Sequence, residues 1–166
     1  MFSRFFPDAT AKSTYDIDFE ALYAQGIRGL LFDIDNTLVA HGAPADARAE
    51  ALFARLKAIG FNCCLISNNK EARVLMFNKN INVNYIYNAH KPSRTGYEQA
   101  MKLMGTNKTN TVFIGDQLFT DVYGAKRTGI RNILVLPIHP KEEIQIVFKR
   151  KLEKIVLYFY KKQKNS

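Results

Sequence analysis

The sequence predicts an α/β fold in which a doubly wound parallel sheet lies between two layers of helices. Short apolar runs of the length of strands alternate with longer stretches of helical periodicity between residues 27 and 136. The first of these runs is mostly apolar, with Ile27, Gly29, Leu30, Leu31 and Phe32, which is typical of strands buried on both faces of a sheet. Strands that alternate with helices pair in parallel and are joined by right-handed crossovers.

The elements before and around the first core strand are short. Residues 1–16 lack periodicity and are expected to form an irregular arm packed on the domain. Residues 16–25 predict a short helix that ends at Gly26. The stretch 27–38, IRGLLFDIDNTL, begins with the apolar run of a buried strand and ends on acidic and hydroxyl side chains. A turn region with Gly and Pro follows at 39–45.

The rest of the chain alternates regularly. Apolar periodicity, with Gly or Pro near most boundaries, predicts helices at 45–58, 68–79, 93–104 and 119–128. Apolar runs predict strands at 61–67, 84–88, 111–115 and 131–136. With the first strand, they make a parallel sheet of five strands.

Composition limits the class of protein. A chain of 166 residues with 47% hydrophobic content suits one globular domain over residues 1–166. Cys63 and Cys64 are adjacent in a predicted strand and point to opposite faces, so they are expected to be reduced core residues. No signal peptide or membrane-length apolar run is found, which predicts a cytoplasmic protein or one held peripherally on the inner face of a membrane.

Much of the formal charge of +9 lies at the C-terminal end. Residues 141–166 hold eight Lys or Arg and three Glu, a net charge of +5. Within them, residues 141–162 predict a basic amphipathic helix whose apolar stripe is formed by Ile144, Phe148, Leu152, Ile155, Val156 and Phe159. Two interpretations remain open: the helix packs on the sheet, or its end at 158–164 also contacts an anionic bilayer.

Four polar motifs occur in order along the chain. Asp33 and Asp35 follow the first strand directly, and open α/β sheets place ligands at that edge. Two carboxylates this close cannot share a dry core without a cation, and Mg²⁺ prefers such oxygen ligands. LISNN at 65–69, HKPS at 90–93 and GDQLFTD at 115–121 complete the set.

This set resembles the haloacid dehalogenase (HAD) superfamily of phosphohydrolases, whose pattern is DxDxT, Ser, Lys-Pro and GDxxxxD. Residues 4–140 also resemble the YqeG-like family of subfamily IIIA, through the Phe-Pro-Asp arm, YDID before the first strand and the GDQxxTD form of the last motif. That family includes phosphatidylglycerophosphate phosphatases. The resemblance implies an HAD-like Rossmannoid fold and hydrolysis of the terminal phosphate of phosphatidylglycerophosphate to give phosphatidylglycerol.

The resemblance also implies roles for the motif residues. Asp33 would be the nucleophile that forms an aspartyl-phosphate, and Asp35 the general acid and base. Mg²⁺ would be held by the carboxylates of Asp33 and Asp116 and by the main-chain carbonyl of Asp35. Lys91 would offset charge on the phosphoryl oxygens, and Asp121 would orient Lys91 or act from the outer shell of the metal.

The other motif residues are expected at the substrate phosphate. Ser67 would donate its hydroxyl to a phosphoryl oxygen, with Asn68 and Lys91 beside it, and Thr37 would steady the loop and contact the same phosphate. The sequence leaves open the roles of four further basic residues: His41, His90, Arg73 and Arg94.

The spacing of the motifs leaves no room for a cap domain. Asp33 and Ser67 are 34 residues apart, and Ser67 and Lys91 are 24 apart, so each interval holds about one helix and one strand. The resemblance therefore implies a capless enzyme. Its open site would suit a large or surface-presented phosphate such as a phospholipid headgroup.

Two alternatives remain open. A phosphatase for a soluble sugar phosphate or a nucleic-acid phosphate end would share every catalytic residue, and a tetramer that closes the open site would favour it; the sequence does not predict the oligomeric state. A non-catalytic ribosome- or RNA-binding module would use the basic tail. The tail has no recognisable RNA-binding motif and no catalytic position is missing, so a nucleic-acid partner is not expected.

Overall fold

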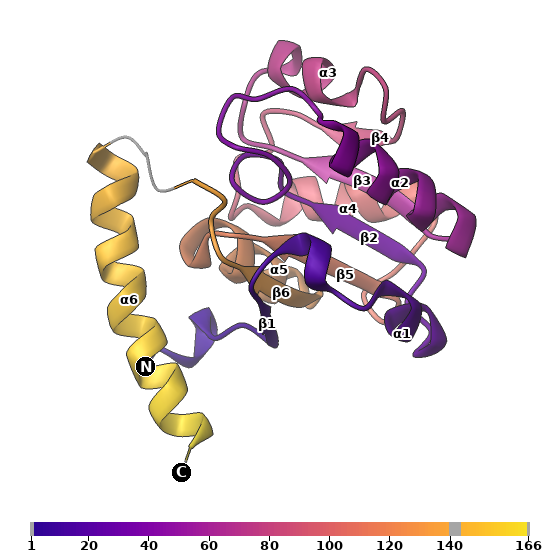
Figure 1. Cartoon of the computed structure of the whole chain (residues 1–166). Helices are drawn as coiled ribbons and strands as arrows, with labels where there is room; N and C mark the ends of the chain where they lie inside the picture. Colours follow the sequence, from indigo (N-terminus) through magenta and orange to yellow (C-terminus); the bar gives the residue numbers. More distant parts are fainter. Residues whose placement is uncertain (1, 140–143, 166) are drawn as a thin grey trace.

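The computed structural model describes residues 2–139 and 144–165 and confirms the three-layer α/β fold (Figure 1). Six strands form one parallel sheet in the order β1-β6-β5-β2-β3-β4. The strands are β1 (Ala9–Ala11), β2 (Gly29–Phe32), β3 (Asn62–Ile66), β4 (Asn84–Ile86), β5 (Thr111–Gly115) and β6 (Arg131–Val135). Five of them lie within the segments that the sequence predicts as strands.

The prediction of an irregular arm over residues 1–16 is wrong for one segment. β1 lies at the edge of the sheet and pairs with β6, with Ala9 opposite Ile133. A strand of three small residues at a half-exposed edge has no apolar run by which the sequence could reveal it. The arm also holds two 3₁₀ turns, η1 (Ser3–Phe5) and η2 (Thr14–Asp16).

The helices lie close to their predicted ranges, with one difference. They are α1 (Phe19–Ala24), α2 (Ala47–Ile59), α3 (Glu71–Asn78), α4 (Arg94–Met104), α5 (Tyr123–Thr128) and α6 (Ile144–Lys164). The predicted helix 119–128 is instead a π-helical turn, η3 (Leu118–Val122), that continues into α5. Short π-helical segments often occur at functional sites, and η3 carries Asp121 of the fourth motif.

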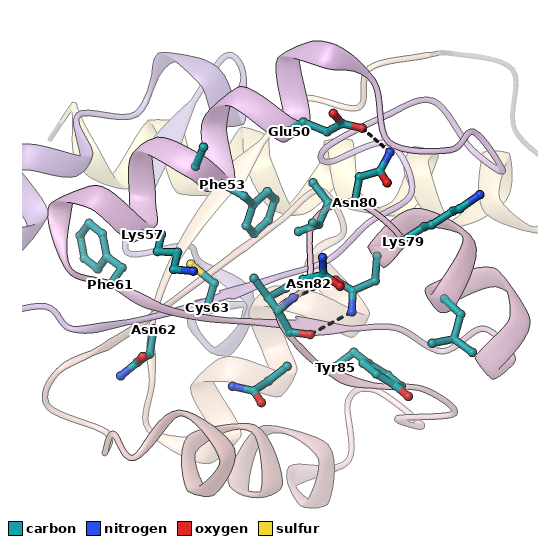
Figure 2. Close-up of a pocket in the computed structure, with 16 residues that line it drawn as sticks. Glu50, Phe53, Lys57, Phe61, Asn62, Cys63, Lys79, Asn80, Asn82 and Tyr85 are labelled. Atoms are coloured by element: carbon teal, nitrogen blue, oxygen red, sulfur yellow. Dashed lines mark hydrogen bonds between the residues drawn. The ribbon is translucent and has the colours of Figure 1, made fainter.

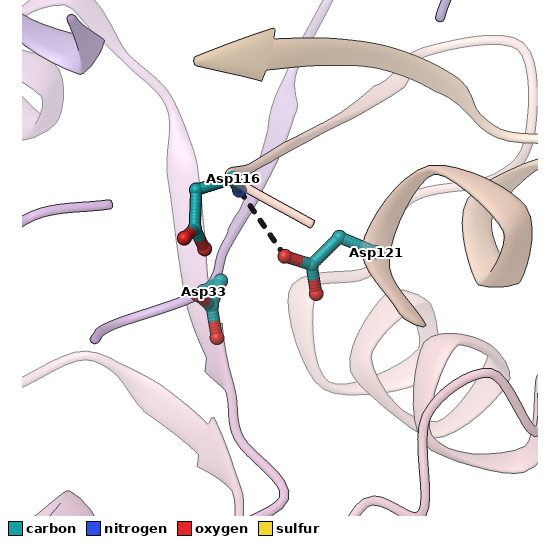
Figure 3. Close-up of side chains that lie close together, drawn as sticks. All are labelled: Asp33, Asp116 and Asp121. Atoms are coloured by element: carbon teal, nitrogen blue, oxygen red, sulfur yellow. Dashed lines mark hydrogen bonds between the residues drawn. The ribbon is translucent and has the colours of Figure 1, made fainter. Parts of the chain in front are cut away.

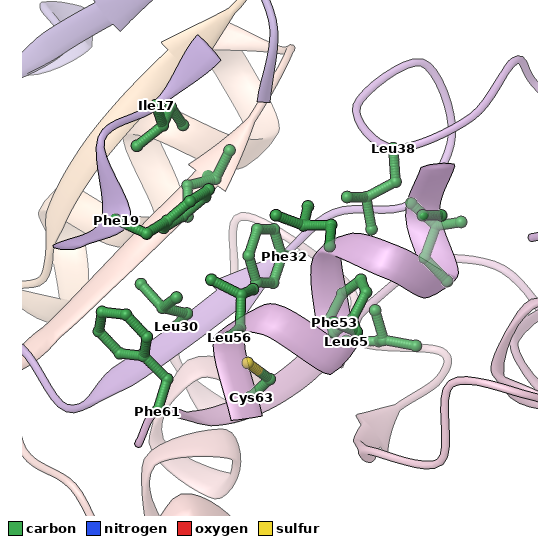
Figure 4. Packing of buried hydrophobic residues seen from close by; sticks show 14 of the residues in the cluster. Ile17, Phe19, Leu30, Phe32, Leu38, Phe53, Leu56, Phe61, Cys63 and Leu65 are labelled. Carbon is green, nitrogen blue, oxygen red and sulfur yellow. The ribbon is translucent and has the colours of Figure 1, made fainter. Parts of the chain in front are cut away.

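The sheet is covered on both faces by apolar clusters. Leu30 and Phe32 of β2 face a cluster with α1 and α2, which Figure 4 shows, whereas Leu31 faces the opposite cluster with α4. Cys63 and Cys64 divide between the same two clusters and are free thiols, as the sequence predicts. Burial raises the pKa of each thiol to about 12, so both stay protonated and unreactive.

No extra domain is inserted between the motifs. α2 is the one α-helix between β2 and β3, and α3 is the one α-helix between β3 and β4; both intervals are described in full. This confirms the capless architecture within the described residues and leaves the carboxyl edge of the sheet uncovered by a cap.

The N-terminal arm fastens the loop that follows β2. The hydroxyl of Thr14 donates to the main-chain oxygen of Thr37 at 2.8 Å, and the hydroxyl of Tyr15 donates to that of Leu38 at 2.6 Å. Asn36 in the same loop has a left-handed φ of 60°. The YDID segment before β2, with its neighbours, thus holds the turn on which Asp35 and Thr37 lie.

α6 stands at the side of the sheet along the N-terminal arm (Figure 1). The predicted helix 141–162 covers most of this element, although residues 141–143 lie outside the described residues. The Phe2 and Phe159 ring centroids are 5.5 Å apart, and those of Phe6 and Tyr160 are 5.2 Å apart. None of the described helices is long and apolar enough to span a bilayer.

α6 packs through only part of the face that the sequence suggests, with Val156 and Phe159 in contact with the domain. Of the predicted stripe, Val156 is buried, but Phe148, Leu152, Ile155 and Phe159 are between 42% and 64% exposed. The helix also packs through Arg150, Glu153, Leu157 and Tyr160, because Arg150 and Glu153 have polar partners in the domain. Phe148, Leu152 and Ile155 therefore form an apolar stripe that faces outward.

Candidate active site

The motif residues gather at one edge of the sheet. Asp33, Ser67 and Asp116 directly follow β2, β3 and β5, and parallel strands end at the same edge. Figure 3 shows Asp33 and Asp116 with Asp121 beside them. One carboxylate oxygen from each of these three buried aspartates lies within 4.8 Å of the others. Three acids so close in a buried site are stable only with nearby cations or with a proton on one of them.

Lys91 supplies one of these cations. Its Nζ donates to Oδ1 of Asp33 at 2.8 Å and to Oδ1 of Asp121 at 2.7 Å, and the residue is 8% exposed. Burial by itself lowers the pKa of Lys91, but the charges of Asp121 and Asp33 outweigh it and hold the pKa above its ordinary value. Lys91 is therefore charged and joins two of the three acids.

Asp121 is engaged through both of its oxygens. Oδ1 accepts from Lys91, and Oδ2 accepts the main-chain N–H groups of Asp116 and Gln117 at 3.2 and 3.1 Å. Burial raises the pKa of Asp121 to about 6, although Lys91 lowers it. A Cβ on Gly115 would lie 2.5 Å from Oδ2, so glycine is needed there for the carboxylate to fit. This geometry agrees with the predicted role of orienting Lys91.

Thr37 lies between the other two acids. Its hydroxyl is 3.1 Å from Oδ2 of Asp33 and 3.1 Å from Oδ1 of Asp116, yet it has a single proton to donate. Burial, and then the charges of Asp33 and Asp121, raise the pKa of Asp116 well above its ordinary value. This pair of oxygens is short of positive charge, and its hard oxygen donors fit a divalent cation such as Mg²⁺.

Asp35 lies outside the group of three acids. Its carboxylate accepts from the main-chain N–H of Gly42 at 2.7 Å, from Nδ2 of Asn69 at 2.7 Å and from Nη2 of Arg73 at 2.9 Å. Oδ1 of Asp35 also lies 3.9 Å from Nδ1 of His41. The structure thus places Arg73 and His41, which the sequence left open, beside the predicted acid and base.

Asn68 lies beside Lys91, and Ser67, which precedes it, directly follows β3. The Ser67 hydroxyl oxygen accepts the main-chain N–H of Asn69 at 3.0 Å. The Asn68 side chain accepts the main-chain N–H of Lys91 at 2.7 Å and donates to its carbonyl at 3.3 Å, so it fixes the lysine backbone. Their phosphate contacts stay predictions.

Two of the residues left open lie apart from the acids. His90 is exposed on a turn, with a φ of 52°. Arg94 pairs with Glu98 on the exposed surface of α4 at 3.1 Å. Neither belongs to the hydrogen-bonded group that surrounds Asp33 and Asp35.

The sequence interpretation assigns no role to Asn69, which contacts Asp35, or to Arg150 of α6. Arg150 of α6 forms an ion pair with Oδ2 of Asp116 and donates to its main-chain oxygen. Glu153 pairs with Arg150 at 3.0 Å and accepts the main-chain N–H of Leu118 at 2.9 Å. Arg150 is one of eight basic residues in the tail, and nothing in their spacing sets it apart.

A separate hollow of about 840 Å³ lies between α2, α3 and the segments around the starts of β3 and β4 (Figure 2). Its lining includes Phe53, Lys57, Asn80 and Tyr85, and it contains none of the motif residues. The candidate active site is therefore the acidic cluster at the sheet edge, away from this hollow.

Comparisons with known proteins agree with the motifs. Residues 88–139 match a family model described as HAD-hydrolase-like. The chain is 35% identical over 165 residues to "Probable phosphatase YqeG" of Bacillus subtilis (strain 168), covering 98% of this chain and 96% of that protein.

Two more distant similarities point the same way. The chain is 28% identical over 163 residues to "Phosphatidylglycerophosphate phosphatase 1, chloroplastic/mitochondrial" of Arabidopsis thaliana, covering 91% of this chain and 47% of that protein. A solved structure of a putative HAD superfamily (subfamily III A) hydrolase from Legionella pneumophila has a TM-score of 0.52 and 22% identity over 69% of each chain. That likeness supports the fold alone.

We expect Lys91→Met to lower the free energy of unfolding at neutral pH by about 3–5 kcal/mol, because it leaves Asp33 and Asp121 buried without their shared cation. Urea denaturation followed by circular dichroism measures the change. Lys126→Met is the matched control, since Lys126 pairs with Asp8 near the surface at 3.5 Å, and it should cost less than about 1 kcal/mol. Equal losses would contradict the assigned pairing.

Proposed function

The chain belongs to the YqeG-like family of HAD phosphatases, and on this basis we propose that it hydrolyses a phosphate monoester through an aspartyl-phosphate on Asp33. The observation that carries the proposal is the state of Asp33: a buried carboxylate at the sheet edge, paired with Lys91 through one oxygen and close to Asp116 through Thr37 at the other. No cap covers this edge, so a phosphate can approach it.

In the proposed reaction, an oxygen of Asp33 attacks phosphorus and the bond to the ester oxygen breaks. Lys91 offsets negative charge on Asp33 and on the phosphoryl oxygens, with Ser67 donating to one of them. Asp121 keeps the Lys91 ammonium in place through their 2.7 Å hydrogen bond. These residues bind and orient the phosphoryl group during the transfer.

Asp35 would handle the protons. Protonated Asp35 gives its proton to the leaving alkoxide; its carboxylate then takes a proton from the water that hydrolyses the aspartyl-phosphate. The hydrogen bonds from Asn69 and Arg73 fix the direction of this carboxylate. Arg73 is thus proposed to position the acid and base.

Mg²⁺ is the proposed metal, held by the carboxylates of Asp33 and Asp116 and the main-chain carbonyl of Asp35. When bound, it neutralises charge on the phosphoryl group and aligns it with the nucleophile. The shortage of positive charge between Asp33 and Asp116 supports this assignment. Asp121, with both oxygens engaged, would act from outside the metal's own ligands.

For the substrate we propose phosphatidylglycerophosphate at the surface of an anionic bilayer. The name of the Arabidopsis relative supports this substrate class, and the uncapped site suits a headgroup that stands out from a membrane. The exposed stripe of α6 gives apolar contact, and Lys161, Lys162 and Lys164 follow it toward the helix end. Each basic residue near an anionic surface adds about 1 kcal/mol of attraction.

We expect Asp33→Asn to reduce Mg²⁺-dependent phosphate release by roughly 10⁴-fold or more while the fold remains intact, because an amide cannot form the acyl-phosphate. Single-turnover phosphate release measures the effect, with circular dichroism to check the fold. Asp46→Asn is the matched control, since Asp46 lies outside the four motifs, caps α2 through the main-chain N–H of Ala49, and Asn caps a helix equally well. Appreciable turnover by Asp33→Asn would remove Asp33 as the nucleophile.

We also expect higher kcat/KM on phosphatidylglycerophosphate in anionic vesicles than on glycerol 3-phosphate. The protein should sediment with anionic but not with zwitterionic vesicles, and salt should weaken the binding through screening. The double variant Phe148→Ser/Ile155→Ser should lose vesicle binding, whereas Leu103→Ser, an equally exposed apolar residue on α4, should keep it. Equal efficiency on a soluble sugar phosphate, without vesicle binding at low salt, would contradict the lipid substrate. Only the assignment as a phosphatase of unspecified substrate would then remain.

A further inference from the structure

We propose that Arg150 is a positioning residue of the metal site, and that metal binding and the docking of α6 therefore support each other. This inference rests on the proposed function in one respect, the divalent cation between Asp33 and Asp116. It adds that α6, which begins 23 residues after Asp121 of the last motif, helps to position a metal ligand.

The two oxygens of Asp116 face different partners. Oδ1 shares the Thr37 hydroxyl with Asp33, and Oδ2 is paired with the Arg150 guanidinium. Arg150 also donates to the main-chain oxygen of Asp116, so it contacts this residue at both the side chain and the main chain. Its contacts with Asp116 leave Oδ1 directed toward Asp33, where a metal would bind.

The contact is buried on both sides. The side chain of Asp116 is fully buried and that of Arg150 is 15% exposed. A buried carboxylate without a partner at its second oxygen would be free to rotate and would be costly to ionise. The guanidinium therefore restrains the Asp116 carboxylate in the orientation in which Oδ1 faces Thr37 and Asp33.

Glu153 extends the same link from α6 to η3. Its carboxylate pairs with Arg150 and accepts the main-chain N–H of Leu118, the first residue of η3. η3 carries Asp121, which in turn holds Lys91. α6 therefore contacts the fourth motif at both Asp116 and Leu118, so its docking influences two of the three clustered acids.

Arg150 could either position Asp116 for the metal or compete with the metal for Asp116. Loss of Arg150 would weaken metal binding in the first case and strengthen it in the second. If the guanidinium occupied the place of the metal, it would lie between the carboxylates of Asp33 and Asp116; its contacts with Asp116 are instead at Oδ2 and the main-chain oxygen. Partners that hold the outer atoms of metal ligands usually raise metal affinity, and their loss costs about 10- to 100-fold. Because coupling is reciprocal, a metal at Oδ1 should also stabilise docked α6.

The test is the affinity of full-length Arg150→Gln for Mg²⁺ and for Mn²⁺, measured by isothermal titration calorimetry without substrate. We expect binding about 10-fold weaker than in the wild type. Arg150→Lys keeps the charge but not the two-point contact, so its metal affinity should lie between those of the wild type and Arg150→Gln. Lys149→Gln, which removes the same charge from the neighbouring exposed residue, should bind as the wild type does.

Hydrogen exchange followed by mass spectrometry gives a second readout that does not depend on activity. Mg²⁺ should slow amide exchange in residues 148–160 of the wild type and leave it unchanged in Arg150→Gln. Unchanged or tighter Mg²⁺ binding by Arg150→Gln would overturn the positioning role while leaving the proposed function standing. A wild type that binds neither cation would instead overturn the metal assignment of the proposed function, and this inference with it.

Discussion

The arrangement of the candidate active site, at the carboxyl edge of the sheet, depends on how the charges of three buried carboxylates are neutralised. Asp33, Asp116 and Asp121 come from two strand ends and a π-helical turn, and their oxygens lie within 4.8 Å of one another. Lys91 pairs with two of them and Arg150 with the third. These two cations leave the gap between Asp33 and Asp116 as the place where further positive charge is needed. In the proposed mechanism, that gap would hold a divalent metal next to the phosphoryl group.

The supporting contacts come from segments far apart in the sequence. Thr14 and Tyr15 of the arm hold the loop after β2, Asn68 holds the backbone of Lys91, and Glu153 holds the start of η3. Each contact fixes main-chain atoms in a segment that carries a charged side chain of the site. The fold thus keeps like charges together by constraining the backbone around them as well as by pairing them.

The sequence predicts the sheet and the acids well, because both depend on local patterns. Apolar runs locate five strands, and Asp33 and Asp116 follow two of them. β1 is not predicted, because its three small residues lie at the edge of the sheet, where pairing with β6 decides their conformation. The sequence does not predict the contact of Arg150 or the outward-facing stripe of α6, because the packed face of a basic helix depends on its tertiary partners. The contact of Arg73 with Asp35 is equally non-local.

The central claim is that Asp33 carries the phosphoryl group during turnover. Rapid acid quench of Asp35→Asn with an aryl phosphate tests it most directly, because the good leaving group needs little protonation while water attack lacks its base. We predict a phosphoenzyme that accumulates toward one phosphoryl group per chain and maps to Asp33 by mass spectrometry. Turnover without a trapped phosphoenzyme, or a phosphoryl group on another residue, would contradict the account.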